Sequence, residues 1–414
     1  MLTETPLDQD EKSLDLLHSK TIFPSANPFP IMIRSLSLSS FGFLLAFAAT
    51  TLSAQEVTVP GNGRTPVSVP AFGGDSGAEA AKIVAADLNR TLLIDAQPTT
   101  GAPYVATGLM AGGSLSAQLL QGNTPVLTKS YAGDLRHMAH EFADDITLAV
   151  TKSKGFATSR IAFISSATGN KELYTADIDG FNSQQLTNDR TISARPKWSF
   201  DGSALAYTSY KSGYPDAYVI RLASNSRTRV AFFPGINSGP CFSPDGHTLA
   251  LTLSKDGNPQ IYTIPVTGGA ATRLTQGHGT ETSPTWAPDG SKIAYDSDER
   301  GSVQLYMVPN GGGNAARLPT NVGYSAEPDW SPDGSKIAFT ARVAGQFQIG
   351  VYDLVSGQSQ VITTTGGEDP SWTRNSRHLV YSHGGAIWIL DTVTRQTAKL
   401  DVGLSQSVDA SVSR

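Results

Sequence analysis

The sequence contains a single cysteine, Cys241, in 414 residues. An intramolecular disulfide is therefore impossible, so an oxidising compartment would be tolerated but not used for cross-linking. Basic residues are also in deficit relative to acidic ones. The formal net charge is −5 at pH 7, and the isoelectric point is near 5.8. This balance argues against nucleic acid as a partner. Glycine and proline, at 40 and 24 residues, are plentiful, as short strands and tight turns require.

Motifs for catalysis are also lacking. The G-x-S-x-G nucleophile motif is absent, and no hydrolase-sized region follows the repeats described below, which argues against the propeller-bearing peptidases. His137 and His140, beside Glu141, are spaced so that their two imidazoles could bind one metal ion. Both fall on the polar side of the predicted helix, however, which favours a helix face exposed to solvent. Gly311-Gly312-Gly313 does not open a helix and is no phosphate loop. We therefore predict no catalytic residue, cofactor or metal.

A repeat of 44 residues organises most of the chain. Asp-Gly turns and tyrosines recur with this step, and a sixth copy arrives two residues early with Val380-Tyr381. A period of 40–45 residues with about four short strands per copy is typical of a β-propeller blade. Six copies predict six blades. The alanines that mark the period are Ala162, Ala206, Ala250, Ala294 and Ala338.

The fourth copy shows the strands of one blade. We expect strands at 283–287, 292–296, 303–308 and 315–318, with the turn Pro288-Asp289-Gly290 between the first two. A bulky aromatic residue holds a second fixed position, and packing between blades is its expected role. The Asp-Gly aspartates are expected to cap their own hairpins rather than form a carboxylate site. These aromatic and acidic positions are Trp198, Phe242, Trp286, Trp330, Trp372, Asp245, Asp289 and Asp333.

The ends of the repeat region predict how the ring closes. The first copy begins at Arg160 without the Pro-x-Trp strand that the other copies carry. After the sixth copy, Ala410-Ser411-Val412 stands in the place of that strand. A strand from 405–412 can therefore complete the first blade and remove the open sheet edges. The propeller is predicted to cover 155–414.

The region before the repeats divides into three parts. Residues 32–54 read as a signal peptide with Arg34, an apolar stretch and a cleavage position after Ala54, and 1–31 as an upstream extension. An uncleaved anchor is the alternative. Residues 55–154 predict a small α/β domain, with a capping box at Ser76 and Glu79 and a second helix near 134–150. Three strands are expected there, at 104–109, 114–120 and 126–130.

The loops that enter the first strand of each blade are expected to converge at one mouth of the channel. They carry varied residues over a constant scaffold, which is how binding surfaces are usually built. The loops between second and third strands join them. Together these loops are 191–195, 235–239, 280–283, 324–327, 366–369, 210–214, 255–258 and 298–302.

The predicted signal peptide, small α/β domain, six-bladed ring and closing strand follow one another along the chain. In this order they resemble the TolB family, the periplasmic component of the Tol–Pal envelope system of Gram-negative bacteria. The resemblance rests on the Trp-Ser-Pro-Asp-Gly-type turns such as 330–334, and on three pieces outside the repeat: 83–88, 135–144 and 158–163. It covers essentially all of 57–414. The fold it implies is an α/β domain followed by a six-bladed propeller closed by a C-terminal strand.

The resemblance implies protein binding without catalysis. The propeller mouth would receive Pal, a peptidoglycan-associated lipoprotein, and the mature N-terminus would bind TolA, an inner-membrane protein. A monomer without direct membrane insertion, acting in envelope integrity, cell division and protein transport, is expected. The family often has a His near Ile236, and its α/β domain is usually longer. The positions carried over are Ile236, Asn237, Ser238, Gly239, Thr282, Ser283 and Glu327 for Pal, and Gln55, Glu56, Val57, Thr58 and Val59 for TolA.

A second hypothesis is a periplasmic propeller enzyme, such as a polysaccharide lyase with a metal at the mouth. It requires several His or carboxylate side chains on the converging loops. No pair of the available residues recurs at metal-ligand spacing, which favours the adaptor. The available residues are His278, Glu281, Glu327, Glu368 and Asp369.

Overall fold

The computed structural model describes residues 63–98 and 100–414, which lie within one compact unit, Thr58–Arg414. The predicted upstream extension, the predicted signal peptide and the segment 55–59 predicted to bind TolA fall outside the described residues. Within the described part of the chain, no helix is long and apolar enough to cross a membrane.

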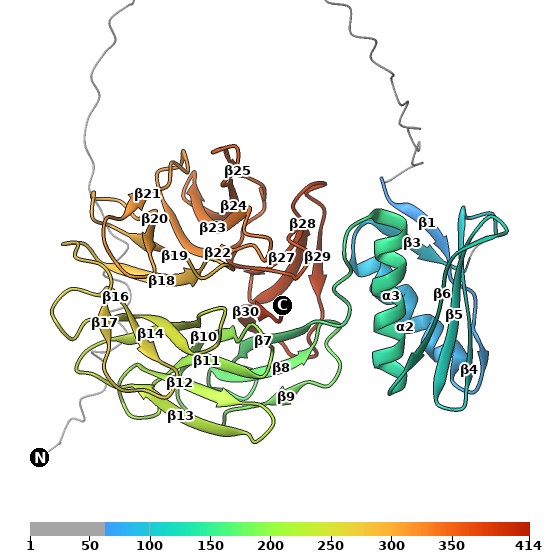
Figure 1. Ribbon diagram of the computed structural model, residues 1–414, viewed down its shortest axis with the longest axis horizontal. Coiled ribbons are helices and arrows are strands. Elements are labelled where there is room, and N and C mark those ends of the chain that lie inside the picture. The colour runs from blue at the N-terminus through green and yellow to red at the C-terminus, as the bar shows by residue number, and fades with distance from the viewer. Residues whose placement is uncertain (1–62, 99) are drawn as a thin grey trace, which may run out of the picture. The chain divides into compact units, whose positions relative to one another are not determined.

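The first described region is an α/β layer of one mixed sheet and two helices. The strands follow the order β3-β1-β4-β5-β6, with β2 also paired to β4, and the helices cover one face of the sheet (Figure 1). The three expected strands are present, whereas β3 was not predicted. The elements are β1 (Thr65–Ser68), β2 (Gly73–Gly74), α2 (Gly77–Arg90), β3 (Ile94–Gln97), β4 (Tyr104–Ala111), β5 (Ser114–Gln121), β6 (Thr124–Ala132) and α3 (Leu135–Thr151).

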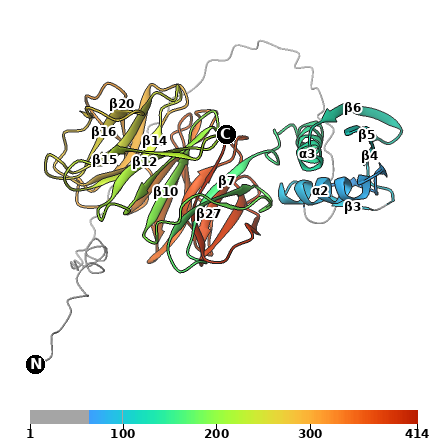
Figure 2. The ribbon, with the colours of Figure 1, turned by 90° about the horizontal axis from the view of Figure 1, so that it is seen from below.

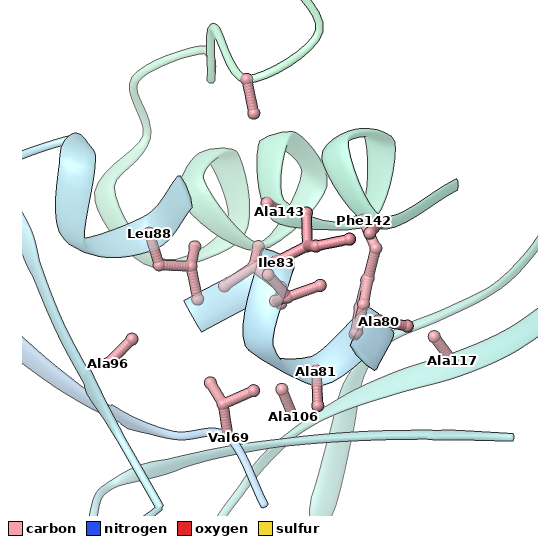
Figure 3. Close-up of a cluster of buried hydrophobic side chains, with 14 of the residues drawn as sticks. Val69, Ala80, Ala81, Ile83, Leu88, Ala96, Ala106, Ala117, Phe142 and Ala143 are labelled. Carbon is pink, nitrogen blue, oxygen red and sulfur yellow. The ribbon is translucent and has the colours of Figure 1, made fainter. Parts of the chain in front are cut away.

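The core of this layer lies between the helices and the sheet. Ile83 and Leu88 of α2, Phe142 of α3 and small residues of the strands, such as Ala106, belong to one buried cluster (Figure 3). The apolar positions recur at helical spacing, so each helix buries one stripe. The small residues on the strands let the helices approach the sheet closely.

The two helix starts differ from each other. Asp134 caps α3, because its side chain accepts a hydrogen bond of 2.9 Å from the His137 amide. The capping box predicted at Ser76 is wrong. Ser76 has φ of 64° and makes no side-chain capping bond, since the chain enters α2 through a tight left-handed turn.

Six four-stranded antiparallel sheets form the propeller and follow one another around the ring in chain order (Figures 1 and 2). The predicted strands of the fourth copy are confirmed within one or two residues. The first blade contains β7 (Arg160–Ser165), β8 (Glu172–Asp177) and β9 (Gln184–Gln185). The others contain β10 (Ser193–Trp198), β11 (Ala204–Ser209), β12 (Asp216–Arg221), β13 (Ser226–Ala231), β14 (Asn237–Phe242), β15 (Thr248–Leu253), β16 (Gln260–Pro265), β17 (Thr272–Arg273), β18 (Glu281–Trp286), β19 (Lys292–Ser297), β20 (Gln304–Pro309), β21 (Ala316–Arg317), β22 (Ser325–Trp330), β23 (Lys336–Val343), β24 (Gln346–Asp353), β25 (Ser359–Val361), β26 (Glu368–Trp372), β27 (His378–His383), β28 (Ala386–Asp391) and β29 (Thr397–Leu400).

The repeated residues have the structural roles expected of them. The five repeat alanines are completely buried, and the five repeated aromatic side chains are at most 7% exposed. Asp289 caps its own turn, because its Oδ1 accepts from the Ser291 amide at 2.9 Å. That hydrogen bond and the one from the Ser291 hydroxyl hold the pKa of Asp289 below its usual value.

The predicted ring closure is confirmed. β30 (Ser407–Val412) is antiparallel to β7, with Ser411 opposite Ala162 and Val412 opposite Ile161. The indole of Trp198, in the next blade, donates to the Ser411 carbonyl at 3.0 Å. The first blade therefore takes its inner strand from the other end of the ring, which leaves no open edge between first and last blades.

Polar contacts join the α/β layer to the last blade. The Asp144 carboxylate of α3 accepts hydrogen bonds from the Ala157 and Thr158 amides and forms an ion pair with Arg374. His378 is completely buried, and its Nε2 lies 2.6 Å from the Thr91 carbonyl oxygen, after α2. These contacts fix the start of the ring against the helices.

Candidate binding site at the mouth of the ring

Each inner strand of the ring has the same irregularity near its start. One residue adopts a left-handed conformation, with φ between 50° and 60°, and the pairing with the neighbouring strand shifts register there. In five blades a proline follows, which lacks the N–H needed for regular pairing. The left-handed residues are Arg195, Gly239, Ser283, Glu327, Asp369 and Asp409.

These six residues, one from each blade, line a small hollow of about 50 Å³ around the axis of the ring. We call them the channel ring. Three carboxylates from successive blades, those of Glu327, Asp369 and Asp409, make one side acidic. The expected convergence of these loops at one mouth is therefore observed.

Arg195 reaches across the channel ring. Its Nη1 donates to Ser283 Oγ at 2.7 Å, and its Nη2 lies 3.8 Å from Glu327 Oε1. Desolvation lowers the pKa of Arg195, but the surrounding carboxylates outweigh it and raise that pKa overall. One guanidinium thus faces three ring carboxylates.

The acidic side retains unrelieved repulsion. Burial, followed by the charges of Glu327 and Asp409, raises the pKa of Asp369 well above its usual value. The adjacent Glu368 also has a raised pKa, first from burial and then from the same two charges. A positive group placed here would therefore be stabilised by the negative charge of these carboxylates and by their arrangement around one hollow.

The other end of the channel is a second hollow, lined by residues of the inner strands and by the last residue of the chain. The Arg414 guanidinium donates to the Trp330 carbonyl at 2.8 Å and lies over the Phe200 ring, 4.4 Å from its centroid. Lys197 forms an ion pair of 3.3 Å with Asp329 nearby.

The predicted site residues at 236–239 have different surroundings. Ile236 is exposed, and Gly239 lines the channel ring. Ser238 is half-buried, with its hydroxyl 3.3 Å from that of Thr208.

Asn237 is completely buried, so its side chain cannot be a contact residue. It accepts from the Phe233 amide and donates to the Phe233 carbonyl, both at 2.8 Å. Its role is to hold the loop that presents Ile236.

The remaining predicted residues lie at or beside the channel ring. Ser283 and Glu327 belong to it, while the Thr282 hydroxyl donates to Asp296. Sequence reasoning missed Arg195 and Asp409 as site residues. The signal was available, because 195, 239, 283 and 327 keep the 44-residue step and each precedes a proline.

The residues available to a lyase do not gather into one set. Glu327, Glu368 and Asp369 lie near the channel, whereas Glu281 lies beside Glu299 under a loop of the fourth blade. Burial, with the charge of Glu299 adding, raises the pKa of Glu281 to about 7, and its Oε2 has no hydrogen-bond partner among the described residues. Among the described residues, the mouth holds no cluster of three possible metal ligands.

The described residues do contain one such cluster elsewhere, formed by Asp87, His140 and Asp179. His140 Nδ1 lies 2.6 Å from Asp87 Oδ2, and its Nε2, without a hydrogen-bond partner, lies 3.9 Å from Asp179 Oδ2. Arg90 and Arg136 already form ion pairs with the two carboxylates. This charge balance suits a buried ion network joining α2, α3 and the turn after β8 better than a dication.

The expectation that both histidines lie on a solvated helix face is therefore wrong for His140. His137 is exposed, but His140 is only 5% exposed, because α2 covers that side of α3. The helical pattern alone could not reveal which polar residues a neighbouring helix would cover.

Comparison with known proteins places this geometry in a family. A family model described as "TolB beta propeller domain" matches residues 148–406. Among curated relatives, the "Tol-Pal system protein TolB" of Geobacter sulfurreducens is 48% identical over 65 residues, 15% of each chain. The protein of the same name from Bordetella avium is 36% identical over 193 residues, covering 37% of this chain and 44% of that one. The chain thus aligns with only 15–16% of the length of the first three such relatives.

A solved structure extends the match over most of the chain. TolB from Acinetobacter baumannii superposes with a TM-score of 0.78 and 27% identity, covering 84% of this chain and 96% of that one. The likeness therefore includes regions outside the span matched by the family model. On the combined evidence of the family model and this structure, the chain belongs to the TolB family.

Proposed function

We propose that this protein is a periplasmic adaptor of the Tol–Pal system that binds proteins and catalyses no reaction. A Pal-type, peptidoglycan-associated lipoprotein would dock at the propeller mouth, and a TolA-type inner-membrane protein would bind the segment 55–59. Through these contacts the protein would support outer-membrane integrity and envelope constriction during cell division. Export by a cleaved signal peptide at 32–54 belongs to the same proposal.

The observation that carries the proposal is the channel ring. Six blades bring one left-handed residue each to the same mouth, and the varied loops surround it. Such a rigid concave face suits recognition of another protein.

The charge of the ring suggests what a partner must supply. Arg195 balances only part of the charge of Glu327, Asp369 and Asp409. A lysine or arginine of the partner would relieve this repulsion, so association should weaken as salt concentration rises.

The lyase alternative has less support. The candidate residues lie in two separate groups, and the Glu281 group includes no nearby third ligand among the described residues. No observation at the mouth favours sugar chemistry over protein binding.

The direct test is calorimetric titration of the mature protein with the soluble domain of the peptidoglycan-associated lipoprotein from the same organism. We expect saturable binding of the unmodified protein. Binding to Asp409→Asn should be about tenfold weaker, since the lysine or arginine of the partner would lose part of the negative charge that it faces. Val393→Ser, in the turn after β28 of the neighbouring blade, is the control at the end opposite the mouth. Undetectable binding of the unmodified protein would contradict the Pal-type assignment.

A further inference from the structure

Four exposed apolar side chains lie on the mouth side of the blade formed by β10–β13 and at the start of the next. Tyr214 is 72% exposed, Phe232 60%, Ile192 40% and Ile236 39%. We call these four residues the apolar arc. Grouped exposed apolar side chains on a soluble protein mark interaction sites far more often than scattered ones do.

Hydrogen bonds place the loops of the arc side by side. The Tyr210 amide donates to the Ile192 carbonyl at 2.9 Å, which joins the first loop to the turn that carries Tyr214. The Asn237 amide donates to the Pro215 carbonyl at 3.1 Å, which joins that turn to the loop of Phe232 and Ile236. The loops that carry the four side chains are therefore joined to one another on the same side of the ring.

The arc is held in place rather than free to collapse. The Arg229 guanidinium lies over the Phe232 ring, 4.7 Å from its centroid, and itself pairs with Asp216 at 2.6 Å. Asn237 fixes the backbone of the same loop from below through its hydrogen bonds to Phe233. Phe232 is thus presented to solvent by a pre-organised loop, which lowers the entropic cost of binding.

The charges around the arc indicate its occupant. Two of the cations at its rim are paired within the chain: Lys211 with Asp189 at 3.1 Å, and Lys255 with Asp256 at 2.5 Å. An anionic lipid surface would have to compete with these carboxylates, so the rim does not favour one. The arc also continues through Ile236–Gly239 into the channel ring, whose far side is acidic.

We propose that the apolar arc is the main anchoring surface for the protein that docks at the mouth. The partner presents a cluster of apolar side chains to Tyr214 and Phe232, and a lysine or arginine beside that cluster points toward the acidic side of the channel ring. The choice of partner rests on the proposed function. What is added is the place where that partner is held, which is the apolar arc away from the ring axis, and the apolar character of the contact.

The first experiment compares Phe232→Ser and Tyr214→Ser with Val393→Ser. Val393 is 69% exposed and lies at the end of β28 opposite the mouth, because the strands of the blade are antiparallel. We expect the two arc variants to bind the lipoprotein domain about tenfold or more weakly, as anchor residues do, with unchanged melting temperatures. Equal affinity of all three variants and the unmodified protein would overturn the proposal.

The second experiment separates the arc from the identity of the partner. A photo-crosslinking amino acid at Phe232, and at Val393 as control, is activated in growing cells and the products are identified by mass spectrometry. A crosslink from 232 alone to the lipoprotein supports both proposals. A crosslink from 232 alone to another protein, whose purified form loses affinity for Phe232→Ser, keeps the arc and rejects the Pal-type partner. A crosslink to a second copy of this chain, to lipid or to nothing overturns the arc.

Discussion

Single buried residues shape the mouth from beneath, and Asn237 shows how. Its side chain satisfies both polar groups of Phe233 while lying fully inside the loop. Removing it would leave buried amide and carbonyl groups without partners, which costs more than the net value of the bonds. Surface residues of the same loop carry no such cost.

Asn237→Ala should therefore lower the free energy of unfolding by about 2 kcal/mol or more, whereas Ile236→Ser should change it by less than about 0.5 kcal/mol. Urea unfolding followed by tryptophan fluorescence measures both. If Asn237→Ala were as stable as the unmodified protein and lost only binding, Asn237 would be a contact residue after all.

Glu281 predicts a pH dependence in the neutral range. Burial raises its pKa in the folded protein to about 7, above the ordinary value of 4.5. Between these pH values the folded state holds a proton that the unfolded state has released. Stability from this group therefore falls as pH rises from about 4.5 to 7, by at most about 3 kcal/mol.

Glu281→Gln removes this titration while keeping the shape of the side chain. The variant should gain stability relative to the unmodified protein between pH 5 and pH 8, measured by urea unfolding at each pH. Asp289→Asn is the matched control, because the pKa of Asp289 is lowered and its contribution is lost only in acid. A constant difference between Glu281→Gln and the unmodified protein would refute the buried-carboxyl explanation.

The strands of the ring were predictable because every blade repeats the same sequence pattern. A small residue such as Ala294 fits where blades approach, and a Pro-Asp-Gly turn reverses the chain, so each position is specified several times over. The strand β3 lacked this redundancy. Its four residues alternate between buried and more exposed positions, but so short a run is a weak signal, and its pairing with β1 is decided by tertiary contacts.

The site was only partly predictable for a related reason. The loop positions followed from the repeat, but the reach of Arg195 to Ser283 depends on two blades that are separated by a third. The burial of His140 likewise depends on α2 lying over α3. Contacts between elements distant in sequence cannot be read from periodicity within one element.

The closing strand carries the largest prediction for a single element. Deleting 407–414 would expose the edge of β7 and remove the Ser411 carbonyl that accepts from Trp198. We expect a loss of about 5 kcal/mol or more and a melting temperature lower by roughly 10 °C or more. Differential scanning calorimetry checks this. A synthetic peptide of residues 405–414 should restore part of the loss, and a peptide of the same composition in scrambled order should not.

For the whole molecule, the junction between the α/β layer and the last blade couples two cores. His378 is at its centre, with Nε2 donating to the Thr91 carbonyl and Nδ1 accepting from Asn375 at 2.9 Å. The aromatic ring of Phe156 packs against the imidazole of His378, with the two ring centroids 5.0 Å apart. Both nitrogens are thus satisfied only by the neutral imidazole, since a protonated Nδ1 would face the Asn375 amide hydrogens.

Acid should therefore loosen this junction before it unfolds the ring. Burial lowers the pKa of His378 to about 4, below its ordinary value of 6.5. Because the unfolded state takes up a proton first, stability from this group is present above about pH 6.5 and is lost as pH falls toward 4, by at most about 3 kcal/mol. Hydrogen exchange at pH 5 should increase around 91–93 and 375–378 relative to pH 7.5, after correction for the intrinsic exchange rate.

A variant pair assigns that effect to His378. His378→Gln, which can still donate to the Thr91 carbonyl, should remove most of the acid-dependent increase in exchange, whereas His137→Gln, at an exposed position of α3, should leave it intact. The same increase in His378→Gln would shift the cause to other groups of the junction, with Asp144 and its ion pair to Arg374 first among them. Because that pair also joins α3 to the last blade, Arg374→Met should then loosen the junction at every pH rather than in acid alone.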